Sequence, residues 1–249
     1  MSQDLTFTTA ISRLGERGVE VRGVPLSDLV AEADFVKTLF FHLTGRQPVT
    51  GELKLLNAML VAALDHGVQP ASGFVPRVVA SVGNDVLTAM AATLLALGPY
   101  HGGAVTGAMK AMIEIKHKGE NVEAACRELV QEYRQAGRRV PGFGHPHYTQ
   151  KDPRAQQLFH LAHDHDLPLE YINLATILET TLEHQLRRKL VLNIDGAIAA
   201  LLLTIGIDPI AGNALFGLAR VAGSIAHIVE EQTSDAGVRR LSDQAVTSG

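Results

Sequence analysis

Two histidines and one aspartate of this chain lie at breaks between apolar segments, where a polar side chain can act on a ligand. His101 lies in "GPYHGGA", before two glycines that let the backbone approach a ligand closely. His145 lies in "VPGFGHPHY", held between Gly144 and Pro146. Asp195 lies in the apolar stretch "LVLNIDGAIAALL", where we expect it at the N-terminal cap of a helix, either as a cap alone or also as a general base. For His101 the alternative interpretation is an ordinary turn histidine, and for His145 it is a solvated loop histidine.

Two arginines add groups that bind carboxylates. Arg154 follows Asp152 and Pro153 in the first turn of a predicted helix, and Arg220 lies among apolar residues of another. A guanidinium on such a face needs a partner, which is either an internal carboxylate or the carboxylate of a ligand.

Other histidines indicate packing or solvation more than a site. The cluster "HLAHDHD", residues 160–166, has the composition of a metal site, but its spacing favours a solvated helix end. His227 lies in "GSIAHIVEE" and is predicted to pack within its helix. We therefore expect no metal site.

Composition limits the class of protein. The chain has 249 residues, 46% of them hydrophobic, and a formal net charge of −4, which argues against a nucleic-acid binder. The lone Cys126 rules out an intramolecular disulfide and is predicted to be a packed thiol. The N-terminus has no signal-peptide pattern, and the longest apolar stretch, residues 196–207, is too short to cross a bilayer. A cytoplasmic protein without a membrane segment is expected.

Helical spacing of apolar residues dominates the chain, so we predict an all-α fold. Residues 27–45 are predicted as one helix capped by Ser27, and residues 84–98 as a helix capped by Asn84 and buried on all sides. Asp-Pro pairs are predicted to start two more helices. Further helices are expected over residues 50–67, 121–137, 152–166 and 208–232.

Strand signals are confined to two short runs, residues 18–24 and 189–194, which form either a small hairpin or extended links. Breaks rich in proline and glycine suggest two domains. We predict a large helical domain from residues 1–104 and 191–249, with a small helical domain, residues 105–190, inserted into it.

Taken together, these stretches resemble the citrate synthase superfamily. The segments "SRLGERGVEVRGVPLSDL", "ALDHG", "GPYHGGA", "VPGFGHPHYTQKDPR", "LNIDGAIAALL" and "GNALFGLARVAGSIAH" follow one another in the family's order. The resemblance covers roughly residues 10–232. It implies a large helical domain with a small inserted one, a homo-oligomer, and an enzyme that makes or breaks a carbon–carbon bond between acetyl-CoA and oxaloacetate.

The resemblance also implies roles for the three polar residues described first. His101 would hydrogen-bond the thioester oxygen and stabilise the enol form. His145 would serve the carbonyl of oxaloacetate or, in reverse, take the proton of the tertiary hydroxyl. Asp195 would exchange the methyl proton of acetyl-CoA. An acetyl thioester is a weak carbon acid, so this base needs a preorganised donor at the enolate oxygen.

The same resemblance assigns the binding residues. His66, Arg154 and Arg220 would hold the keto acid, and Arg239 is the candidate for an arginine contributed across a subunit interface. The "PGFG" backbone would line the coenzyme A site, formed by Pro141, Gly142, Phe143 and Gly144. Coenzyme A enters as a thioester substrate, and no bound cofactor is expected.

The chain lacks a block that common citrate synthases have between "G-x-x-P" and "DH". In this it resembles citryl-CoA lyase and the lyase module of ATP-citrate lyase. The leading prediction is therefore cleavage of citryl-CoA to acetyl-CoA and oxaloacetate. A citrate or 2-methylcitrate synthase is the first alternative, a lyase for another acyl-CoA the second, and a non-catalytic binding subunit the third.

Overall fold

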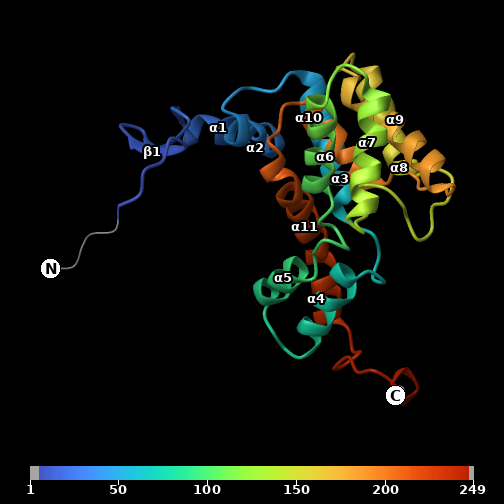
Figure 1. Ribbon diagram of the computed structural model, residues 1–249. Helices are drawn as coiled ribbons and strands as arrows, with labels where there is room; N and C mark the ends of the chain where they lie inside the picture. The colour runs from blue at the N-terminus through green and yellow to red at the C-terminus, as the bar shows by residue number, and fades with distance from the viewer. Residues whose placement is uncertain (1–5, 247–249) are drawn as a thin grey trace. The chain divides into compact units, whose positions relative to one another are not determined.

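The computed structural model describes residues 6–246 and has eleven α-helices and little strand in that range, which confirms the all-α prediction (Figure 1). The chain divides into two compact units, residues 1–57 and 58–249. The division falls inside α3 (Thr50–Leu64). The boundaries of the inserted domain predicted above stay a prediction.

The first unit is a small sheet followed by two helices. Its elements are β1 (Ser12–Gly15), β2 (Gly18–Val21), β3 (Val24–Pro25), α1 (Leu26–Glu32) and α2 (Phe35–Thr44). The strands are antiparallel in the order β1-β2-β3. Of the two forms expected for residues 18–24, a small hairpin or an extended link, the hairpin is the one that forms, and β1 adds a third strand to it. Val21, Leu29 and Phe41 form its core.

The second unit contains the remaining helices. They are α4 (Ala71–Ser81), α5 (Val86–Leu95), α6 (Val105–His117), α7 (Val122–Gln135), α8 (Pro153–Asp164), α9 (Glu170–Leu186), α10 (Ile194–Thr204), η1 (Pro209–Ala211), α11 (Gly212–Thr233) and η2 (Asp243–Ala245). Helix α10 is buried from Gly196 to Leu202 and packs against α6, α8 and α9. The long helix α11 packs against α4, α5 and α6 (Figure 1). These two helices carry Asp195 and Arg220.

Helix α11, with the 3-10 turn before it, is the one segment among residues 6–246 that is long and apolar enough to cross a bilayer. Helices that pack inside a protein pass the same test, and α11 is a packed helix here. Cys126 is fully buried, as predicted, and burial raises the pKa of its thiol to about 11.

Several predicted element ends need correction. Residues 27–45 form two helices, because Ala33 adopts a left-handed conformation (φ 54°) and Asp34 caps a new helix by accepting a hydrogen bond from the Lys37 N–H. Helix α5 is capped by Asp85 rather than Asn84. The run 189–194 takes the other predicted form, an extended link, with an isolated bridge between Phe143 and Leu192. The Asp-Pro starts at residues 152 and 208 are confirmed.

The prediction that residues 84–98 are buried on all sides is also wrong. In α5 the side chains of Leu87 and Leu95 are 75% and 86% exposed. The helix buries the opposite face, at Ala89 and Ala92, against α4 and α11. Its sequence therefore suits a helix covered on more sides than this single chain covers.

Candidate active site

Asp152 and Arg154 form the first part of the site, at the start of α8. The preceding loop ends at Asp152, whose side chain accepts a hydrogen bond from the Arg154 N–H and so caps the helix. The same carboxylate binds the Arg154 guanidinium, with 2.8 Å between Oδ2 and Nη2. Burial alone would raise the pKa of Asp152, but the hydrogen bonds and charge of Arg154 lower it overall. The pair is therefore an ion pair between a fully buried carboxylate and a guanidinium that stays partly exposed.

His66 reaches this arginine from the turn after α3. Asp65 Oδ1 accepts hydrogen bonds from the N–H groups of His66 and Gly67, at 2.7 and 3.0 Å, which fixes the turn. His66 Nδ1 then lies 3.4 Å from Arg154 Nη1. Burial lowers the pKa of His66, and the charge of Arg154 lowers it further, so the ring is neutral at pH 7.

His145 completes this cluster from the loop before α8. Its ring lies edge-on to that of His66, with 5.7 Å between centroids, and 4.5 Å from the ring of Tyr148. The N–H groups of His147 and Tyr148 both point at His145 Nδ1 at 3.1 Å. Nδ1 is therefore an acceptor, and the proton of the neutral ring lies on Nε2. This geometry suits His145 as a hydrogen-bond donor to a ligand oxygen more than as a base.

The glycine-rich stretch that carries His145 is bonded to the segment before α10. Gly144 N–H donates to the Val191 carbonyl at 2.7 Å, and Asn193 donates through its N–H to Gly142 and through Nδ2 to Gly144. Gly142 and Gly144 both have φ of 88°, a conformation that favours glycine. The loop of His145 and the start of α10 therefore form one bonded structure.

Gly142 is predicted to be sensitive to substitution. A Cβ at Gly142 would lie 2.7 Å from Gly196 Cα, and the positive φ adds strain. Gly142→Ala should lower the free energy of unfolding by roughly 2–4 kcal/mol, measured by urea denaturation. The matched control is Gly137→Ala, which has φ of 64° and open space around it. Equal losses for the two variants would contradict a role for the contact with Gly196.

His101 is held by a serine that the sequence analysis did not single out. His101 Nε2 lies 2.8 Å from Ser72 Oγ, and Ser72 Oγ accepts a hydrogen bond from Arg220 Nη1 at 2.8 Å. The hydroxyl hydrogen of Ser72 is then left to donate to Nε2, which places the ring proton of His101 on Nδ1. Burial lowers the pKa of His101, and the Arg220 charge lowers it further. His101 therefore offers a neutral N–H donor.

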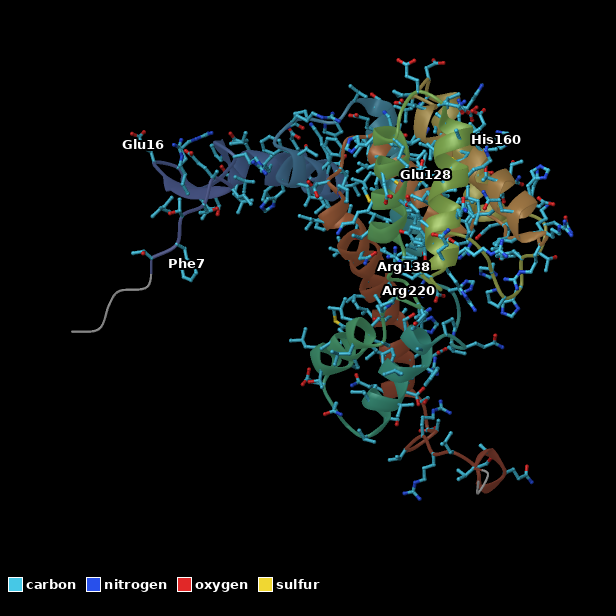
Figure 2. All side chains as sticks on the ribbon, viewed as in Figure 1. Phe7, Glu16, Glu128, Arg138, His160 and Arg220 are labelled. Carbon is cyan, nitrogen blue, oxygen red and sulfur yellow. The ribbon has the colours of Figure 1, made fainter. Side chains whose placement is uncertain are left out.

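Arg220 is buried part-way along α11, only 5% exposed (Figure 2). Its Nε donates to the Ala63 carbonyl at 3.0 Å. With Ser72, this bond fixes the guanidinium between the end of α3, the start of α4 and His101.

Asp195 lies one residue inside α10, and its predicted place at the cap is wrong. Asn193 is the cap, because its Oδ1 accepts hydrogen bonds from the N–H groups of Asp195 and Gly196. The Asp195 carboxyl is freed from capping. Burial raises its pKa to about 6, although the charges of Arg154 and Arg220 act to lower it. Such a carboxyl changes its protonation state near neutral pH, as a proton-transfer group must.

The structure thus brings six of the predicted residues into one region of the second unit. His66 lies beside both Arg154 and His145, and His101 is joined to Arg220 through Ser72. Asp195 feels the charges of both arginines. The six residues that the structure brings together are His66, His101, His145, Arg154, Asp195 and Arg220.

Arg239 lies elsewhere in this chain. It binds Glu231 through Nε and Nη2, and Glu231 also binds Arg77. Glu231 is eleven residues beyond Arg220 on α11, which corresponds to about 16 Å along the helix. A role for Arg239 in a neighbouring subunit's site stays a prediction, as does coenzyme A binding by Pro141–Gly144.

Sequence reasoning missed Ser72, Asp65 and Asn193. Each is an ordinary residue at a helix end, and only the tertiary contacts reveal its part in the site. His227 was predicted to pack, and it lies partly buried with Nε2 3.1 Å from Asp65 Oδ1. Among residues 6–246, no group of three or more His, Cys, Asp or Glu is placed to hold a metal ion.

The helical architecture and the two-part site define the class: a protein with the citrate synthase-like fold. The family "Citrate synthase, C-terminal domain" matches residues 32–241. The chain therefore belongs to the citrate synthase family.

Two solved structures and one sequence relative illustrate the relationship. Citryl-CoA lyase from Hydrogenobacter thermophilus aligns over 98% of this chain and 94% of its own, with 33% identity and a TM-score of 0.88. Citrate synthase from Thermoplasma acidophilum, in a ternary complex with carboxymethyl coenzyme A and oxaloacetate, aligns over 86% of this chain and 57% of its own, with 28% identity and a TM-score of 0.70. Citrate synthase 2 of Bacillus subtilis is 28% identical over 211 residues, which cover 83% of this chain and 55% of the relative's length. The chain thus spans about half the length of that relative.

Proposed function

We propose that the protein is a citryl-CoA lyase, which cleaves citryl-CoA to acetyl-CoA and oxaloacetate. The observation that carries the proposal is the juxtaposition of two half-sites. One half, His66, His145 and the two arginines Arg154 and Arg220, suits a keto acid, and the other, His101 and Asp195, suits a thioester enolate. Ser72 joins Arg220 to His101 and so connects the two halves. Similarity to the Hydrogenobacter lyase along almost the whole of both chains supports this direction of the reaction.

The geometry supports a role for each residue in the cleavage. Arg154 and Arg220 bind the carboxylates of the citryl group and so hold the bond to be broken in a fixed geometry relative to the catalytic groups. This lowers the entropic part of the activation barrier. His145 donates through Nε2 to the oxygen that changes from hydroxyl to ketone. The hydroxyl proton passes to solvent as this oxygen becomes a ketone, and solvent later returns to Asp195 the proton that it gives to the enolate carbon, so the proton balance closes. When the carbon–carbon bond breaks, His101 donates through Nδ1 to the enolate oxygen of the acetyl thioester. Asp195 in its acid form then protonates the enolate carbon.

The first test is to incubate the purified protein with citryl-CoA and identify the products by mass spectrometry. Acetyl-CoA and oxaloacetate are the expected products. Citrate and free coenzyme A would instead indicate hydrolysis of the thioester, as in the alternative of a citrate or 2-methylcitrate synthase. If neither pair forms from folded protein, the lyase proposal fails, and a different acyl-CoA or a non-catalytic binding subunit becomes the better account.

We also infer that the protein is a homo-oligomer and that it acts in the cytoplasm on small molecules, without a nucleic-acid or membrane partner. Support for the oligomer comes from an apolar face on two helices, composed of Leu87, Leu94, Leu95, Leu218, Ile225 and Val229. These side chains recur at helical spacing on α5 and α11. Leu94 and Leu218 border one hollow of about 600 Å³. A surface of this kind is typical of a protein–protein interface.

Disruption of this apolar face should change the oligomeric state. Leu95→Asp adds a charge at a side chain that is 86% exposed in the single chain, so the fold should be kept while the association is weakened. Light scattering coupled to size-exclusion chromatography should show a smaller species than the wild type. Val49→Asp, at an exposed residue outside the apolar face, is the control. An unchanged mass for Leu95→Asp would argue against this face as the interface.

A further inference from the structure

We propose that Asp152 is a positioning residue for this reaction. It selects the edge of the Arg154 guanidinium that meets the substrate, and it ties that arginine to the helix that carries Asp195. The inference rests on the proposed function, because it assigns Arg154 to a ligand carboxylate. It gives a role in the site to a residue that the sequence pattern explains as a helix cap alone.

The contacts of Asp152 exceed what a cap requires. Its side chain is fully buried and accepts four hydrogen bonds from two segments of the chain. Oδ1 accepts from the Arg154 N–H and from Arg154 Nε, both at 3.0 Å. Oδ2 accepts from Arg154 Nη2 at 2.8 Å and from the Ile194 N–H at 3.1 Å. Only the first of these bonds caps α8.

The bonds to the guanidinium determine which of its edges is available. A guanidinium has five N–H donors in a planar fork, and a carboxylate can bind one edge in a bidentate manner. Asp152 occupies the edge formed by Nε and Nη2. The remaining nitrogen, Nη1, lies 3.4 Å from His66 Nδ1, so the free edge faces the histidine cluster. Arg154 is therefore held in the orientation needed for a second carboxylate, that of the substrate.

The fourth bond couples this arginine to the proton-transfer group. Ile194 is the first residue of α10, and Asp195 follows it. The N–H groups of Asp195 and Gly196 donate to the Asn193 side chain. The Ile194 N–H, which this cap leaves free, donates its hydrogen bond to Asp152. A single carboxylate thus fixes both the arginine and the start of α10, where Ile194 is 42 residues beyond Asp152 in the sequence.

The chain contains a natural comparison for a cap without this role. Asp208 precedes Pro209 just as Asp152 precedes Pro153, and its carboxylate accepts a hydrogen bond from the Ile210 N–H at 2.8 Å. Asp208 is exposed, whereas Asp152 is only 1% exposed. The same substitution at Asp208 therefore measures the effect of exchanging a capping aspartate that has no guanidinium to bind.

The test replaces each aspartate by serine. Serine caps a helix about as well as aspartate, but it cannot bind a guanidinium through two oxygens. In Asp152→Ser, kcat/KM for citryl-CoA should fall about 10²-fold, since a small displacement of a positioning group has that effect. Oxaloacetate binding, measured by calorimetry, should weaken more than acetyl-CoA binding. Asp208→Ser should keep wild-type values.

A double-mutant cycle separates positioning from a general loss of structure. If Asp152 acts through Arg154, then adding Asp152→Ser to Arg154→Ala should lower kcat/KM for citryl-CoA, and the affinity for oxaloacetate, by less than a further factor of about two. A full multiplication of the two losses, or wild-type activity and oxaloacetate binding in Asp152→Ser, would overturn the proposal. Should the serine variant not fold, Asp152→Asn enters the same cycle.

The two proposals fail in different ways. Wild-type protein that binds oxaloacetate but does not cleave citryl-CoA would contradict the lyase activity. The positioning role would then still be decided by the oxaloacetate affinities of the same four proteins in the cycle. A serine variant with wild-type oxaloacetate affinity contradicts the positioning role even if the wild type is an active lyase.

Discussion

Asp195→Asn should reduce turnover of citryl-CoA by about 10³-fold and at the same time stabilise the protein at pH 7. The loss of activity is expected because an amide cannot protonate the enolate carbon, and a positioned acid or base contributes about 10²–10⁴-fold. Steady-state kinetics with citryl-CoA measures it. Asn is nearly isosteric with Asp, and the cap of α10 belongs to Asn193, so the helix start should be preserved.

The gain in stability follows from the pKa of Asp195, which burial raises from 3.8 to about 6. Because the folded pKa is above the unfolded one, the protonated carboxyl stabilises the fold fully below pH 3.8, and this contribution is lost as the pH rises through 6. At pH 7 the cost is at most about 3 kcal/mol, calculated at 1.36 kcal/mol per pKa unit. The amide avoids it, so the thermal midpoint should rise by several degrees at pH 7 and not at pH 3.5.

The same pKa predicts opposite pH dependences for the two directions of proton transfer. Cleavage needs the acid form of Asp195, so kcat/KM for citryl-CoA should decline above about pH 6. Exchange of the acetyl-CoA methyl protons with deuterated water needs the carboxylate, so it should increase across the same range. The charged groups that act on this carboxyl are Arg154, Arg220 and Asp152.

Asp164→Asn, at an exposed aspartate of α8, is the control for these measurements. It should change neither activity nor the pH dependence of stability. Near-normal turnover in Asp195→Asn would remove this residue as the proton-transfer group. An unchanged midpoint would contradict the burial of a charged carboxylate at neutral pH.

Arg154→Ala should weaken oxaloacetate binding by about 10²–10³-fold, which is the effect expected from loss of a buried charge partner. Two terms combine: the ligand carboxylate loses its guanidinium, and Asp152 remains buried without its counter-ion. Acetyl-CoA binding should change much less, because the contacts of Arg154 are to Asp152 and the His66 side of the site. Calorimetric titration with each ligand separately gives both affinities.

Arg134→Ala, at an exposed arginine in the last turn of α7, controls for a simple change of net charge. Its affinities should match those of the wild type. Equal losses for oxaloacetate and acetyl-CoA in Arg154→Ala would mean that the arginine supports the fold of the site and does not bind the keto acid.

The sequence predicted the parts of the fold that local rules determine. Asp-Pro pairs start helices wherever they occur here, because the side chain caps and the proline needs no donor. The break at Ala33 was missed, because helical propensity and apolar spacing continue through it. The burial of α5 was overestimated, since periodicity does not tell which neighbour covers a helix.

In the site, too, the sequence predicted what local patterns determine and missed what tertiary contacts determine. Motif order identified His101, His145, Arg154, Asp195 and Arg220, and the structure brings these residues together. The sequence could not reveal that Ser72 joins His101 to Arg220, because this contact links residues 148 positions apart. It also placed Asp195 at the cap, since Asn193 and Asp195 are both good capping residues and only the backbone geometry decides between them.

The position of Tyr148 makes the site visible to spectroscopy. The chain has no tryptophan and four tyrosines, and the Tyr148 ring packs against His145 with the Arg154 guanidinium 5.6 Å from its centre. Ring currents from Tyr148 should displace the proton resonances of His145 from their usual positions. A bound dianion would offset the positive charge of the guanidinium, change the electric field at the Tyr148 ring and so alter the ultraviolet absorption of the phenol. Occupancy of the keto-acid half could thus be followed in the unlabelled protein, without a reporter group.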